Sequence, residues 1–170
     1  FSQYISQSII WKSICEIDKI DFNRNNENDS FMIEHPFLSL YYSSQGIERI
    51  QKAIIELICK KNHILDEEKN KVYELLTSHS HNGLNSWIEN KTGVQLNKVC
   101  HVFVDIIMEF YNNTRYARYS DEQYTEDSSR EYHLLRKLSS KNNSTLDDTI
   151  KNNFGKYLGD LTQKYYKLYT

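Results

Sequence analysis

The fold is decided by PFLSLYYSSQGIERIQKAIIELICKK, residues 36–61. Apolar residues recur there at helical spacing and cover most of the girth of a helix. Pro36 suits a first helical turn, where its fixed φ is favourable. A helix that is apolar over most of its circumference is usually central in a bundle. We therefore predict a long central helix from Pro36 to about Lys61. Its remaining polar strip consists of Gln45, Glu48, Lys52 and Glu56.

Helical patterns lie on both sides of this segment, and turn residues are scarce. The chain has only 5 glycines and 1 proline, a balance that favours helices over sheets. We expect helices over residues 2–20, 67–77, 84–90, 95–111, 128–138 and 146–168. Polar, asparagine-rich loops are expected at 21–30 and 139–144, and a further loop at 78–83. The prediction is a single all-α domain, an up-and-down bundle of four to five main helices plus short helices.

Composition narrows the class of protein. A length of 170 residues fits one domain, and a formal charge of −2 gives no global attraction to nucleic acid or to an anionic membrane. No apolar run approaches the roughly 18 residues of a membrane span, so no membrane association is expected. The three cysteines, Cys15, Cys59 and Cys100, are far apart, which argues against a disulfide framework and for a cytoplasmic, reducing compartment.

The stretch YNNTRYARYSD, residues 111–121, is dense in side chains that bind phosphate or stack on bases. Arginine binds phosphate through its planar fork, and tyrosine stacks on bases. The predicted nucleotide- or RNA-binding residues are Arg115, Tyr116, Arg118 and Tyr119. Two other interpretations stay open. The arginines could be structural, paired with Glu109, Asp105 or Asp121, or the stretch could form a dimer interface, where arginine and tyrosine are both enriched.

Histidines and carboxylates also suggest a metal site. His79 and His81 stand two residues apart, and His101, Asp105 and Glu109 share one face of the predicted helix. No third or fourth ligand stands at a characteristic spacing, and polar ridges of this kind occur on most amphipathic helices. We predict no metal and no cofactor.

Four local signals, in order, resemble the HEPN superfamily of helical nucleotide-binding domains. They are the Glu48–Lys52 pair within an aliphatic helix, the turn around residues 78–84, an aliphatic helix that ends in an aromatic residue, and the segment 113–119. The resemblance covers about residues 36–138, with helices 1–20 and 146–168 as additions. It implies a homodimer, supporting polar roles for Glu48, Lys52, His79, His81, Asp105 and Glu109, and a place in bacterial defence or toxin–antitoxin systems, with a nucleotidyltransferase or another protein as partner.

The sequence departs from the ribonuclease members of that superfamily. Those members have a histidine four to six residues after an arginine, and here neither Arg115 nor Arg118 is followed by one. We therefore predict a non-catalytic module that binds nucleotide, RNA or a protein partner. One alternative is a metal-independent endoribonuclease with a displaced pair, either Arg130 with His133, or Arg115 with His79 or His81. The other is a structural dimerisation domain of a larger assembly.

Overall fold

The computed structural model describes residues 2–22, 30–62, 66–115, 130–139 and 146–168. These residues form seven α-helices and a π-helix, with no strand among them. The helices are α1 (Ser2–Asp18), α2 (Ser30–Asn62), α3 (Asp66–Thr77), α4 (His81–Thr92), α5 (Lys98–Glu109), η1 (Phe110–Thr114), α6 (Arg130–Arg136) and α7 (Leu146–Tyr166). The predicted all-α bundle is confirmed.

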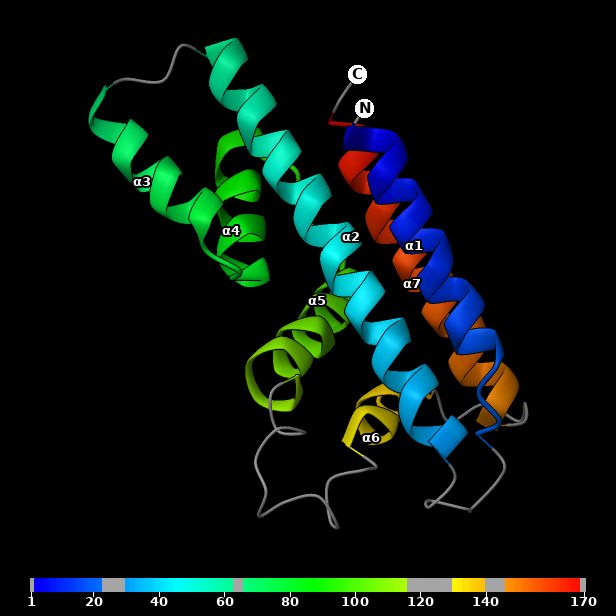
Figure 1. Cartoon of the computed structure of the whole chain (residues 1–170). Helices are drawn as coiled ribbons and strands as arrows, with labels where there is room; N and C mark the ends of the chain where they lie inside the picture. Colours follow the sequence, from blue (N-terminus) through cyan, green and yellow to red (C-terminus); the bar gives the residue numbers. More distant parts are fainter. Residues whose placement is uncertain (1, 23–29, 63–65, 116–129, 140–145, 169–170) are drawn as a thin grey trace.

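The long helix α2 runs through the middle of the molecule (Figure 1). Helices α1 and α7 lie side by side along one flank of α2 and run antiparallel to each other, while α3 and α4 lie on the other flank. Helices α5 and α6 cover the part of α2 nearer its first turns. At 1.5 Å per residue, the 33 residues of α2 extend about 50 Å, which is long enough to contact both groups of helices.

One hydrophobic core joins helices from both ends of the chain. Ile17 of α1, Ile54 of α2, Phe103 of α5 and Phe154 of α7 are all buried in it. The rings of Phe103 and Phe154 meet edge to face, with centroids 5.4 Å apart. The flanking helices α1 and α7 therefore build the same core as the central segment. Val102, which the spacing places on the core face of α5, lies instead on the outside and is 37% exposed.

The central helix begins earlier than the sequence predicts. It starts at Ser30, so Pro36 lies inside it rather than in its first turn. Proline lacks an N–H, and the carbonyl four residues upstream loses its usual donor. The extension is held against α1 by His35, whose Nδ1 lies 2.6 Å from Oε2 of Glu16. This contact joins two helices, so local spacing does not reveal it.

Caps set the ends of α4 and α5. The hydroxyl of Ser80 accepts a hydrogen bond from the backbone N–H of Gly83 at 3.1 Å, so α4 begins at His81, inside the predicted loop. Gly93 ends α4 in the left-handed region, with φ of 71°, as the predicted break requires. Asn97 caps α5 by accepting from the N–H of Cys100 at 2.8 Å.

Other predictions fall partly outside the described residues. Tyr116, Arg118 and Tyr119 lie there, as do most of the two asparagine-rich segments. None of the described helices has the combined length and hydropathy that a membrane crossing requires. The three cysteines are free thiols, and Cys100 is fully buried.

Candidate functional site

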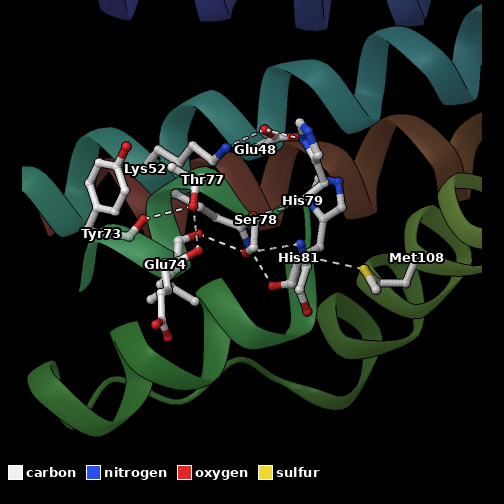
Figure 2. Close-up of polar contacts among 12 residues, drawn as sticks. Glu48, Lys52, Tyr73, Glu74, Thr77, Ser78, His79, His81 and Met108 are labelled. Carbon is white, nitrogen blue, oxygen red and sulfur yellow. Dashed lines mark hydrogen bonds and ion pairs between the residues drawn. The ribbon is translucent and has the colours of Figure 1, made fainter. Parts of the chain in front are cut away.

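A buried carboxylate connects α2 with the turn that precedes α4 (Figure 2). Glu48 is only 7% exposed, and its Oε1 lies 2.7 Å from Nζ of Lys52. Nδ1 of His79 donates to both oxygens of the same carboxylate, at 3.0 and 3.1 Å. Burial alone would raise the pKa of Glu48, but the hydrogen bonds from Lys52 and His79 outweigh it and hold that pKa below its usual value. Glu48 is therefore a charged group at the base of the site.

The i,i+4 spacing predicts the Glu48–Lys52 pair, and the structure forms it. The spacing says nothing of what covers the pair, which is the turn at residues 78–80, because His79 reaches back across 31 positions of sequence to Glu48. His79 itself remains 54% exposed in its side chain. Since a carboxylate can only accept, Nδ1 of His79 bears the proton in this contact, and Nε2 is the other ring nitrogen of a partly exposed imidazole.

A second, fully buried network lies beneath this pair. Oε1 of Gln51, on α2, lies 3.1 Å from Nδ1 of His81. Nε2 of Gln51 donates to the carbonyl of His81 at 3.1 Å and to the hydroxyl of Tyr165 at 2.8 Å. Tyr165 in turn donates to Oδ1 of Asn85 at 2.9 Å. Burial lowers the pKa of His81 to about 4, so its imidazole is neutral at pH 7.

The π-helix η1 brings Tyr111, and Arg115 directly after it, next to His79 and His81. The backbone N–H of Arg115 donates to the carbonyl of Phe110, five residues upstream, at 2.9 Å. π-Helical turns of this kind are frequent at functional sites. The ring of Tyr111 stacks on His79, with centroids 5.2 Å apart, and meets His81 edge-on at 6.3 Å. The guanidinium carbon of Arg115 lies 4.8 Å from the ring centroid of Tyr111 and 5.4 Å from that of Tyr41.

The fold therefore brings together some of the predicted site residues. Glu48, Lys52, His79, His81 and Arg115 form one cluster, although they come from three separate stretches of sequence. We call the cluster of Tyr41, Glu48, Lys52, His79, His81, Tyr111 and Arg115 the α2–η1 site.

The other predicted residues have different surroundings. Asp105 accepts from Nδ2 of Asn82 at 3.2 Å, and Glu109 is ion-paired with Lys137. The structural alternative, in which an arginine pairs with Glu109, Asp105 or Asp121, stays open, because Arg118 and Asp121 lie outside the described residues. Arg130 begins α6, and His133 is exposed on that helix. Among the described residues, no group of three or more histidines, cysteines and carboxylates is placed to hold a metal ion.

The sequence does not predict Tyr41 and Tyr111 of the α2–η1 site, or Gln51 and Tyr165 of the buried network. Apolar spacing puts Tyr41 on the apolar face of the central helix, and Tyr111 opens the basic stretch but is not among its predicted binding residues. A signal was present, because Tyr41 precedes Glu48 by seven residues, or about two turns, and so shares its side of the helix. Gln51 and Tyr165 gave no such signal, since they meet only after folding.

Comparison of the chain with protein-family models, with curated proteins and with solved structures found no match. The HEPN resemblance therefore stays a prediction from the residues quoted above.

Proposed function

We propose that this chain is a non-catalytic helical module that binds RNA or a nucleotide at the α2–η1 site. The observation that supports it is the position of Arg115, with its guanidinium over the rings of Tyr41 and Tyr111. Stacking on aromatic faces restricts the plane of a guanidinium, and a restricted planar fork loses less entropy when it binds phosphate. The cluster thus combines a phosphate-binding side chain with rings on which a base can stack.

The local charge favours an anion even though the whole chain has a formal charge of −2. Lys52 neutralises Glu48 across 2.7 Å. Arg115 supplies a guanidinium beside this pair, so two cationic side chains, Lys52 and Arg115, belong to a site with one buried carboxylate. An anionic ligand is therefore attracted by this local patch, and the net charge of the whole chain does not contribute to the attraction.

A second candidate function has its own support, because Arg115 and His79 both contact the ring of Tyr111. This closeness favours the pairing of Arg115 with His79 over Arg130 with His133 in the endoribonuclease alternative. Nε2 of His79 would take the proton of a ribose 2′-hydroxyl, whose oxygen would attack the adjacent phosphorus. The bond between phosphorus and the 5′-oxygen would break, and the departing oxygen would take a proton from solvent water, giving a cyclic phosphate without a metal.

The resemblance adds two further proposals about association. It implies a homodimer, and a nucleotidyltransferase or another protein as partner. Both are separate from the α2–η1 site, whose support is geometric.

The test is binding and cleavage of labelled single-stranded RNA by the purified chain at low salt. We expect a bound complex and intact RNA, with binding weakened about tenfold or more by Arg115→Ala, since hydrogen bonds to charged groups contribute about 1.5–3 kcal/mol. Products ending in a cyclic phosphate, lost in His79→Ala, would instead support the endoribonuclease.

The matched control is Arg136→Ala. Arg136 also lies over a tyrosine, 5.4 Å from the ring centroid of Tyr132, but it is outside the α2–η1 site. Equal weakening by both arginine variants would mean non-specific attraction, and the absence of any RNA complex would refute the proposed function.

A further inference from the structure

The hydrogen-bond network around Gln51 fixes where the proton of His81 lies. The carbonyl of His81 can only accept, so the atom of Gln51 that lies 3.1 Å from it must be the amide nitrogen. The amide oxygen of Gln51 then faces Nδ1 of His81 at 3.1 Å and requires a donor. Nδ1 therefore bears the proton, and Nε2 has a free lone pair.

No group in the part of the chain that the structure describes donates a hydrogen bond to this lone pair. Nε2 of His81 is buried and has no hydrogen-bond partner there. A buried polar atom without a partner costs about 1–3 kcal/mol, and such atoms are uncommon in folded proteins. Burial also lowers the pKa of His81, so protonation does not occupy the position near neutral pH.

The ring of Tyr111 lies against both histidines of the site. It stacks on His79 with centroids 5.2 Å apart, and its plane is 75° from that of the His81 ring at 6.3 Å. Tyr111 lies in the π-helix and is partly exposed to solvent. A flat heterocycle in the same position would likewise contact both imidazoles, and the edge of a base carries N–H groups that the hydrocarbon edge of a tyrosine ring lacks.

We propose that Nε2 of His81 accepts a hydrogen bond from an N–H on the edge of a nucleobase, which takes the place of the Tyr111 ring against His79. This inference rests on the proposed function, because it adds base contact to a site where Arg115 binds phosphate. Gln51 is then a positioning residue, since it determines which ring nitrogen of His81 is the acceptor. Tyr165 orients Gln51 from α7 through the 2.8 Å hydrogen bond.

The test is ¹⁵N nuclear magnetic resonance of the full chain labelled at histidine, with two probes. One probe is single-stranded hexa-adenylate RNA, and the other is the same ribose-phosphate backbone without bases. We expect His81 of the free protein to show an unprotonated Nε2 and a protonated Nδ1. Hexa-adenylate should shift the Nε2 signal, whereas the abasic oligomer should bind without shifting it.

A variant gives an independent measurement. His81→Phe keeps a flat ring but has no acceptor, so we expect its affinity for hexa-adenylate to fall about tenfold, toward that for the abasic oligomer, with the affinity for the abasic oligomer unchanged. If this variant does not fold, the spectra of the wild-type chain still test whether Nε2 of His81 contacts the base.

The outcomes separate the two proposals. Hexa-adenylate binding with an unmoved His81 signal, or a protonated Nε2 in the free protein, would overturn the inference and leave the proposed function standing. Failure of both oligomers to bind the wild-type chain would refute the proposed function itself.

Discussion

Two buried ionisable side chains of the α2–η1 site have opposite surroundings. Glu48 receives hydrogen bonds from Lys52 and His79 and is stabilised as a carboxylate. For His81, burial outweighs the attraction of the Glu48 carboxylate and favours the neutral form, and Nδ1 is its one hydrogen-bonded ring nitrogen among the described contacts. Glu48 thus adds fixed charge to the site, whereas His81 adds an uncharged acceptor.

His81 should make stability depend on pH between about 6.5 and about 4. Its pKa is lowered from 6.5 to about 4 in the folded chain, so the unfolded chain binds the proton first as the pH falls. The stabilisation is fully present above pH 6.5 and is lost toward pH 4. At about 1.4 kcal/mol per pKa unit, we expect a loss of about 3 kcal/mol in the free energy of unfolding, measured by urea denaturation across this range.

The control for this prediction is His81→Phe, whose stability should change far less between pH 6.5 and 4.5. The lowered pKa of Glu48 acts below its usual value of 4.5, so it contributes little to that interval. An equally steep pH dependence in the variant would show that another group is responsible.

At the scale of elements, α1 packs close against α2 at Gly46. A Cβ added there would lie 2.6 Å from Cγ1 of Ile10, an atom next to the backbone of a stiff, β-branched side chain. Alanine improves helix propensity by about 1 kcal/mol, but overpacking costs about 1–3 kcal/mol. We expect Gly46→Ala to lower the free energy of unfolding by about 1 kcal/mol, measured by chemical denaturation.

A matched glycine on α7 provides the comparison. A Cβ added at Gly159 meets nothing within 4 Å, so Gly159→Ala should gain stability, by up to about 1 kcal/mol, from helix propensity alone. If Gly46→Ala were also stabilising, α1 would have to move aside at little cost, and the close packing of Ile10 against α2 would not hold in solution.

The same element shows what the sequence can and cannot predict. Apolar spacing over most of the girth of α2 predicts its central position, because that property depends on local sequence alone. The extension of α2 back to Ser30 includes His35, which meets Glu16 of α1, and a contact between two helices cannot be predicted from local spacing. Likewise, i,i+4 spacing predicts the pairing of Glu48 with Lys52, but the arrival of His79 depends on how α4 sits against α2.

At the scale of the whole molecule, the segment with the HEPN resemblance does not form the hydrophobic core by itself. The resemblance covers about residues 36–138 and leaves α1 and α7 as additions. In the structure, α7 buries Phe154 against Phe103, and Tyr165 bonds to Gln51 in the interior. Helices α1 and α7 are therefore needed to cover one flank of α2 and to complete the hydrophobic core.

We predict that a fragment of residues 30–139, without α1 and α7, will not unfold cooperatively. Each large apolar side chain that becomes exposed costs about 1.5–3 kcal/mol, and α7 alone buries five side chains, which are Ile150, Phe154, Leu158, Leu161 and Tyr165. Their loss is comparable with the whole stability of a domain, about 5–15 kcal/mol. Thermal denaturation followed by circular dichroism should show a broad, non-cooperative change for the fragment.

The control is a chain of residues 2–168, which is trimmed at both ends but keeps α1 and α7 whole, and it should unfold in one sharp transition. A sharp transition in the 30–139 fragment would mean that α1 and α7 are dispensable additions to a self-sufficient core. The two results also bear on the α2–η1 site, because α7 orients Gln51 through Tyr165. A fragment that folded without α7 would lose the hydrogen bonds that Tyr165 makes with Gln51 and Asn85.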